Sequence, residues 1–175
     1  QVKLVAMGDV FADHLKTRLD ALKTQFPEKI DVDKDHRFVG FDAYKGVIES
    51  SDVVLLASTP HFRPRHLKAA VEAGKHVFCE KPVAVDGPGV RSVLESSTLA
   101  KERKLSLVSG LCWRYHNQKT ATMQRVLDGD IGDIVSMETT YNAGGVWDPR
   151  RRRDQVDSEM EYQLRNWYYY TWLSG

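Results

Sequence analysis

The chain has 175 residues, of which 42% are apolar. This length fits one ordinary domain with part of a second, and the apolar fraction is that of a globular protein rather than a disordered one. A formal net charge of +1 gives no general attraction to nucleic acid or anionic lipid, and no apolar run approaches the roughly 20 residues of a membrane helix.

Strand-like and helix-like patterns alternate in the first part of the chain. Residues 2–7 are an apolar run typical of a strand, and apolar residues then recur every three or four positions over residues 11–26, as on one face of an amphipathic helix. The alternating acids of residues 31–37 lack the glycine and the terminal glutamate of a calcium loop, so we expect a solvated loop there. A short helix is predicted over residues 42–49, with Asp42 as its N-cap.

The middle of the chain continues this alternation. Residues 52–57 are a continuous apolar run, which is typical of a strand buried on both faces. A helix is predicted over residues 64–74, a strand over 76–79, a helix over 86–104 and a strand over 105–109. Strands that alternate with helices through tight loops predict βαβ units, hence a doubly wound α/β fold with a parallel sheet, right-handed crossovers and helices on both faces.

The last third of the chain differs from the rest. A further helix is predicted to end at Gly129, and residues 134–141 alternate enough to predict a longer strand with one exposed face. Glycines and the arginine run 150–153 predict an exposed loop, and residues 162–172 are rich in tyrosine and tryptophan. Arginines beside aromatic residues also occur in nucleic-acid sites, but the near-zero net charge favours a solvated loop and a packed aromatic core.

The cysteines and histidines predict neither a disulfide nor a metal site. Cys79 and Cys112 lie inside strand-like runs, which favours buried free thiols in a reducing compartment and therefore a cytoplasmic protein. A periplasmic location, reached through an export signal that precedes residue 1, stays open. The histidines show none of the spacings that zinc-binding helices use.

Four loops are candidates for a ligand site, because ligands of doubly wound sheets bind beyond the carboxyl ends of the strands. They are residues 8–9, 58–61, 80–82 and 112–115. The first contains Asp9, whose carboxylate is suited either to bind both ribose hydroxyls of an adenine nucleotide or to cap the following helix. The glycine fingerprint G-x-G-x-x-G that normally precedes such an acid is absent from the chain.

Lys81 stands between an acid and a proline at the end of a predicted strand. The proline restricts the backbone, in the trans or the cis form, and aims the lysine into the crevice. A partly buried lysine has a lowered pKa and exchanges protons with a substrate hydroxyl, while Glu80 holds its ammonium group. The alternative is a surface salt bridge at a turn. His61 and His66 flank the start of the next helix, where a histidine is usually a polar cap.

Residues 57–61 and 69–82 together resemble the Gfo/Idh/MocA family, which contains glucose–fructose oxidoreductase, inositol dehydrogenase and their relatives. The string Ala-Gly-Lys-His-Val-Phe-Cys-Glu-Lys-Pro at residues 73–82 is its most recognisable signature. Residues 128–134 are similar to the start of the family's second domain, and the resemblance runs from Val2 to the end of the chain.

The resemblance implies an NAD(P)-binding Rossmann domain over residues 1–115, incomplete at its N-terminus. It implies that residues 116–175 begin a second α/β domain with an open, mostly antiparallel sheet. Members of the family move a hydride between NAD(P) and a carbon that carries a hydroxyl group, usually on a sugar or cyclitol. The implied partners are a small sugar-like substrate and, at full length, further copies of the chain, and not nucleic acid or a membrane. Two alternatives stay open: a glycosidase or epimerase that uses the nicotinamide transiently, and a non-catalytic dinucleotide-binding module.

The resemblance also implies roles for the candidate residues. Asp9 matches the acid that binds the ribose, and because no arginine follows it, NAD is favoured over NADP. Lys81 matches a lysine that contacts the nicotinamide ribose and the substrate, which makes it the candidate catalytic residue, and Arg114 matches a contact in a cofactor-side loop. The candidate cofactor-binding residues are Asp9, Ser58, Thr59, Pro60, His61, His66, Glu80, Lys81, Pro82, Trp113 and Arg114.

Two departures from the family pattern predict that the chain is an internal piece of a longer protein. The glycine fingerprint of the first strand is missing at the front, and the Asp/His motif that supplies the main proton-transfer residue would lie beyond Gly175. The first strand is central in such a sheet, so without it the strands near Val2 and Asp52 lose their common neighbour. We therefore expect this piece to bind NAD weakly or not at all and to be marginally stable.

Overall fold

The computed structural model describes residues 2–147 and 149–175 and divides them into two compact units. The first unit runs to Ser109 and also includes Thr171–Gly175, and the second is Gly110–Tyr170. The domain boundary expected between residues 115 and 116 stays a prediction. No helix in the described part of the chain is long and apolar enough to cross a membrane.

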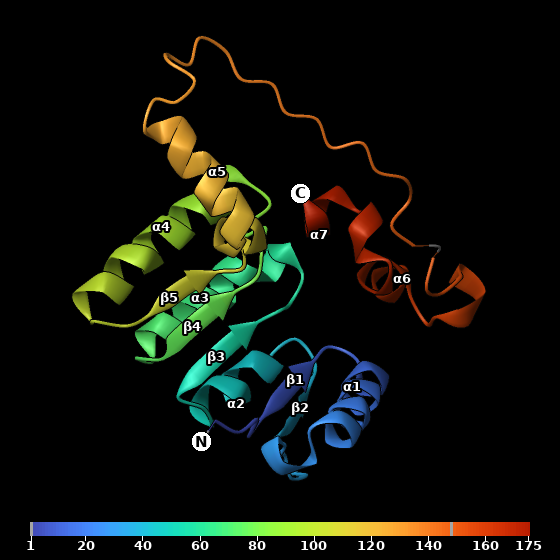
Figure 1. The fold of residues 1–175 in the computed structure, drawn as a ribbon. Helices are drawn as coiled ribbons and strands as arrows, with labels where there is room; N and C mark the ends of the chain where they lie inside the picture. The colour runs from blue at the N-terminus through green and yellow to red at the C-terminus, as the bar shows by residue number, and fades with distance from the viewer. Residues whose placement is uncertain (1, 148) are drawn as a thin grey trace. The chain divides into compact units, whose positions relative to one another are not determined.

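Strands and helices alternate strictly up to the last strand of the first unit (Figure 1). The strands are β1 (Met7–Asp9), β2 (Arg37–Val39), β3 (Val53–Leu56), β4 (His76–Cys79) and β5 (Leu107–Ser109). The helices of this unit are α1 (Ala12–Gln25), α2 (Ala43–Glu49), α3 (Arg63–Glu72), α4 (Gly87–Glu102) and α7 (Thr171–Ser174). This order confirms the predicted βαβ units, although the sequence patterns did not predict β2.

Every strand pair in the first unit is parallel, but the strands form two sheets. β1 pairs with β2, with Gly8 opposite Phe38. β4 lies between β3 and β5 in the second sheet. Within the described residues no strand pairs with both β1 and β3. The structure therefore agrees with the expectation that these two strands lack a common neighbour. The strand expected over residues 2–7 forms instead at Met7–Asp9. In the described residues before it, Leu4 makes an isolated bridge to Ile30.

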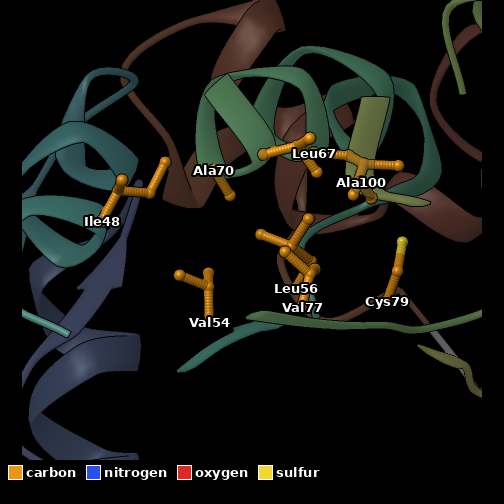
Figure 2. Close-up of a cluster of buried hydrophobic side chains, with 9 residues drawn as sticks. Ile48, Val54, Leu56, Leu67, Ala70, Val77, Cys79 and Ala100 are labelled. Carbon is orange, nitrogen blue, oxygen red and sulfur yellow. The ribbon is translucent and has the colours of Figure 1, made fainter. Parts of the chain in front are cut away.

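The main core lies between the β3–β4–β5 sheet and the helices α3 and α4, as Figure 2 shows. Val54 and Leu56 of β3 point into this core and are 2% and 5% exposed. Their neighbours Val53 and Leu55 point the other way and are 55% and 65% exposed. The prediction that residues 52–57 are buried on both faces is therefore wrong, because side chains alternate along a strand and the helices cover only one face.

The smaller sheet has helices on both faces, as predicted. Met7 of β1 packs with Leu15 and Leu19 of α1. Gly8 faces the other side, where a side chain would come within 3.0 Å of Val47 in α2. A glycine at this position lets α2 approach the strand closely.

Local signals at the helix ends explain where α3 and α4 begin and end. Pro64 lies in the first turn of α3, where its missing N–H costs no hydrogen bond. Gly74 follows the helix with a φ of +74°, a conformation that glycine adopts without strain. Asp86 caps α4 by accepting a hydrogen bond of 2.7 Å from the backbone N–H of Gly89.

The second unit contains the helices α5 (Asn117–Leu127) and α6 (Glu159–Arg165). The strand expected over residues 134–141 does not form in the structure, and Val135 and Met137 are 93% and 84% exposed. A strand needs a hydrogen-bonded partner, and the described residues of this unit contain no other strand. For the same reason the antiparallel sheet expected here is absent from the described residues.

The aromatic residues near the end of the second unit pack together, as predicted. The Trp147 ring lies 5.8 Å from the Trp167 ring and 5.0 Å from the Tyr168 ring, between centroids. Asn166 is 2% exposed, and its side-chain oxygen accepts a 2.7 Å hydrogen bond from the backbone N–H of Arg150. The arginine run 150–153 is exposed, as expected for a loop.

Both cysteines are free thiols, but only one is buried. Cys79 lies in β4 and is buried, as expected. Cys112 is exposed and lies in a 3₁₀ turn, so its predicted place in a buried strand is wrong. Its apolar neighbours do not continue β5, which ends at Ser109.

Candidate functional site

Two of the four predicted loops leave the sheet side by side. Residues 58–61 follow β3, and residues 80–82 follow β4. In the parallel register Leu56 lies opposite Cys79, so both loops begin at the same level of the carboxyl edge. The backbone N–H of Glu80 continues the ladder by donating a 3.0 Å hydrogen bond to the carbonyl oxygen of Leu56.

Lys81 lies at this edge, but its side chain is exposed. Its backbone N–H donates a 3.2 Å hydrogen bond to Oε2 of Glu80, and the Lys81–Pro82 peptide bond is cis. The prediction of a partly buried lysine is therefore wrong for this structure. The predicted ion pair is also wrong, since in the described residues no salt bridge joins Glu80 and Lys81.

Arg63 is a residue of the site that the sequence reasoning missed. It is the first residue of α3 and only 5% exposed. One guanidinium nitrogen, Nη1, donates a hydrogen bond to the carbonyl oxygen of Pro82. Burial lowers the pKa of Arg63, while the neighbouring groups of Cys79 and Glu80 act in the opposite direction. The signal in the sequence was its spacing, because Arg63 stands four residues before the core residue Leu67.

His66 is half-buried and lies in the first turn of α3. Its ring stacks on Tyr44 of α2, with centroids 4.3 Å apart and planes 20° apart. Its Nδ1 lies 3.3 Å from the hydroxyl oxygen of Ser58. Burial lowers the pKa of His66 to about 4, and the charge of Arg65 adds to this shift. The imidazole therefore does not cap the helix and is neutral at physiological pH, and its role in cofactor binding stays a prediction.

The loop after β3 holds an unsatisfied hydroxyl group. Oγ1 of Thr59 is buried and has no hydrogen-bond partner in the described structure. Pro60 is buried and begins the 3₁₀ turn Pro60–Phe62. A buried polar atom without a partner is costly, so this hydroxyl is a candidate contact for a polar ligand.

The short helix α7 packs on the same turn. The Trp172 ring meets the His61 ring edge-on, with centroids 5.2 Å apart, and Leu173 is 0% exposed. A side chain at Gly175 would lie 3.7 Å from the backbone of Val85, in the segment after β4. Helix α7 therefore contacts both the turn after β3 and the segment after β4. His61 is consequently an aromatic contact rather than the polar cap that is usual at such a position, and its role in cofactor binding stays a prediction.

Asp9 ends β1, so it also lies at the carboxyl end of a parallel strand. Its Oδ1 accepts a 2.8 Å hydrogen bond from the backbone N–H of Phe11 and lies 3.8 Å from Nδ1 of His14. Phe11, and not Asp9, is the N-cap of α1. The carboxylate thus supports the turn into the helix, and with 38% of the side chain exposed it stays accessible to a ligand.

Trp113 and Arg114 belong to the second unit, in the 3₁₀ turn Cys112–Tyr115 that follows β5. Trp113 is 60% exposed, and Nζ of Lys119 lies 4.4 Å from its ring centroid. The carbonyl oxygen of Arg114 accepts a 3.2 Å hydrogen bond from Oγ1 of Thr120. The role of this turn in cofactor binding stays a prediction. Among the described residues no group of three or more histidines, cysteines or acids could hold a metal ion.

Known proteins that resemble the chain include several dehydrogenases. The chain is 35% identical to the inositol 2-dehydrogenase of Klebsiella pneumoniae (strain 342) over 97 residues, which are 54% of this chain and 28% of that protein. It is 28% identical to the levoglucosan dehydrogenase of Pseudarthrobacter phenanthrenivorans, over 56% of this chain and 25% of that protein. The chain therefore spans less than a third of the length of these curated relatives.

Solved structures share the fold. Myo-inositol 2-dehydrogenase from Lactobacillus plantarum superimposes with a TM-score of 0.58 at 25% identity, over 77% of this chain and 36% of that one. Scyllo-inositol dehydrogenase from Lactobacillus casei, solved with NAD(H) and scyllo-inositol, gives a TM-score of 0.57 at 24% identity, over 75% and 35%. The model of one family, described as "Oxidoreductase family, NAD-binding Rossmann fold", matches residues 12–111. Since this match covers more than half of the chain, the chain belongs to the Gfo/Idh/MocA oxidoreductase family.

Proposed function

We propose that the whole protein transfers a hydride between NAD and a hydroxyl-bearing carbon of a sugar or cyclitol. One observation carries the proposal: the loops 58–61 and 80–82 emerge together at the carboxyl edge of parallel strands, where such folds bind ligands. The relatives named inositol 2-dehydrogenase and levoglucosan dehydrogenase support a cyclic polyol as the substrate class.

The residues at the carboxyl ends of β1 and β3 fit a dinucleotide. The buried hydroxyl of Thr59 lacks a partner, and the accessible carboxylate of Asp9 suits the two hydroxyl groups of a ribose. Val10 follows Asp9, so no adjacent arginine is present to accept a 2′-phosphate. This pattern supports NAD rather than NADP. When bound, NAD supplies the acceptor of the hydride, and the protein binds and orients the reactants.

Lys81 is our candidate for the residue that contacts the substrate. Its exposed ammonium group offers three hydrogen-bond donors at the carboxyl edge. We propose that it donates a hydrogen bond to the oxygen of the reacting alcohol and stabilises the negative charge that develops there, while a base elsewhere in the whole protein takes the alcohol proton. The backbone contact of Lys81 with Glu80 would keep the loop in place.

The test compares two lysines on opposite ends of β4 in the whole protein. Lys81 follows this strand at its carboxyl end, and Lys75 precedes it at its amino end. With NAD and myo-inositol, scyllo-inositol or levoglucosan, we expect Lys81→Ala to lower kcat on the order of 100-fold or more, and Lys75→Ala to leave it unchanged. The measurement is the absorbance of NADH formed during turnover.

Two results would contradict the proposal. Unchanged turnover in Lys81→Ala would remove the lysine from the reaction. Conversion of a substrate without net NADH would indicate instead an enzyme that uses the nicotinamide transiently.

The two free cysteines support our further proposal of a reducing, cytoplasmic compartment, which fractionation of cells would test. Formation of oligomers by the whole protein also stays a proposal, for light scattering to test.

A further inference from the structure

Arg63 is an unusual residue to find inside the first unit. Arginine is rarely buried without a charged partner, yet this side chain is 5% exposed at the start of α3. The core residues Leu67 and Ala70 follow it on the same face of the helix. The guanidinium group therefore points inward, toward the sheet edge, and not into solvent.

The buried guanidinium group has few partners. Nη1 donates to the carbonyl oxygen of Pro82, and Nε is buried without a partner. In the described residues no carboxylate lies within salt-bridge distance of Arg63. A buried cation without a paired anion is unfavourable for stability, and a well-packed apolar residue in such a place is often as stable or more so. Stability alone therefore does not explain an arginine at this position.

The contact that Arg63 makes holds the loop carrying Lys81. In the described residues three hydrogen bonds from N–H donors tie this loop down: from Glu80 N–H to Leu56, from Lys81 N–H to Glu80, and from Arg63 to Pro82. The Cys79 thiol also donates, over 3.6 Å, to the carbonyl oxygen of Glu80 and does not reach beyond it. The first continues the strand ladder, and the second is internal to the loop. Only the third reaches the residue after Lys81, and it comes from α3, which is anchored in the core.

We propose that Arg63 is a positioning residue, which fixes the backbone of Lys81 through the carbonyl group of Pro82. This inference rests on the proposed function, because it assigns Arg63 to the lysine of that reaction. Helix α3 and strand β4 are rigid neighbours in one core. A hydrogen bond from the helix to the loop extends this rigidity to the backbone that carries the exposed side chain of Lys81.

The activity test uses three variants of the whole protein. Arg63→Met keeps an unbranched side chain, although a shorter one, and removes its donors. Arg63→Lys keeps a charged donor group, and Arg65→Met alters an exposed arginine two residues along the same helix. We expect Arg63→Met to lower kcat on the order of 10- to 100-fold. The Kd for NADH should not change, and the denaturation midpoint should stay the same or rise. Arg63→Lys should recover most of the activity, and Arg65→Met should match the unmodified protein.

Hydrogen exchange gives a second reading that does not depend on catalysis. In Arg63→Met, the backbone amides of residues 80–85 should exchange roughly tenfold faster, while those of α3 and β4 keep their protection. This result stands even if the unmodified protein forms no NADH, so failure of the proposed function is distinguished from failure of the inference. Unchanged exchange in the loop overturns the inference. The inference is also overturned if the fall in kcat is fully explained by a smaller fraction of folded protein, because a purely structural role of Arg63 predicts that result.

Discussion

The imidazole of His66 makes the stability of the fold depend on pH. Burial lowers its pKa from an ordinary value near 6.5 to about 4, and Arg65 contributes. Between these values the unfolded chain binds a proton that the folded chain does not, so stability falls as the pH falls from about 6.5 toward 4. At pH 5 this difference in proton binding lowers the free energy of unfolding by about 2 kcal/mol.

His66→Phe tests this dependence because it keeps an aromatic ring against Tyr44 but binds no proton. We expect urea unfolding to show that the unmodified chain loses about 2 kcal/mol more than His66→Phe between pH 7 and pH 5. The exposed His116 supplies the control, and His116→Gln should behave as the unmodified chain does. Equal pH dependence in the unmodified chain and His66→Phe would contradict a half-buried, neutral imidazole.

Single residues of the site differ in how far the sequence could identify them. The string at residues 73–82 located Lys81, because that pattern is continuous in the sequence. Arg63 and Trp172 were missed, because each acts through a contact between separate segments. The exposure of Lys81 was also out of reach, since burial depends on which elements cover a loop and not on its own residues.

The strand β3 offers a direct test of which sheet face is covered. Leu56 is 5% exposed and packs against α3, whereas the adjacent Leu55 is 65% exposed on the opposite face. We expect Leu56→Ala to lower the free energy of unfolding of this chain by about 2–4 kcal/mol, and Leu55→Ala by at most about 0.5 kcal/mol. Denaturant unfolding of the two variants measures both values.

The two variants share a strand, a residue type and a substitution, so strand propensity affects both alike. Their difference therefore reports burial on one face against exposure on the other. A cost for Leu55→Ala as large as that for Leu56→Ala would show that something covers the outer face of the sheet in solution.

Periodicity predicted the elements better than it predicted their surroundings. The spacing of apolar residues placed α1, α3 and α4 within a few residues of their observed ends, because helix formation and its caps are local. The strand expected over residues 134–141 did not form, because a strand depends on a partner that its own pattern does not reveal. The same dependence explains why β2 was missed.

The division of the strands into two separate sheets limits how the chain by itself can bind a dinucleotide. A dinucleotide in a doubly wound fold lies across the carboxyl ends of several neighbouring strands. Here β1, which carries Asp9, and β3, which precedes Thr59, are not paired with each other or through a shared strand in the described residues. The sequence already indicated an incomplete crevice, because it lacks the G-x-G-x-x-G fingerprint. In a complete crevice the backbone N–H groups of that loop bind the pyrophosphate.

We therefore expect the 175-residue chain to bind NAD far more weakly than the whole protein. Isothermal titration should give no saturation for the chain below roughly 1 mM NAD, where binding contributes only about 4 kcal/mol, while the whole protein binds in the micromolar range. The physical reason is that the ribose contact at Asp9 and the loop contacts near Thr59 lie on sheets that no hydrogen bonds join, so binding must first fix their spacing. Asp9→Ala in the whole protein is the matched comparison, because it removes one contact and leaves the sheets joined. Micromolar binding by the chain itself would mean that the packing of α2 and α3 already holds the two sheets in register, and that pairing between β1 and β3 is unnecessary for the site.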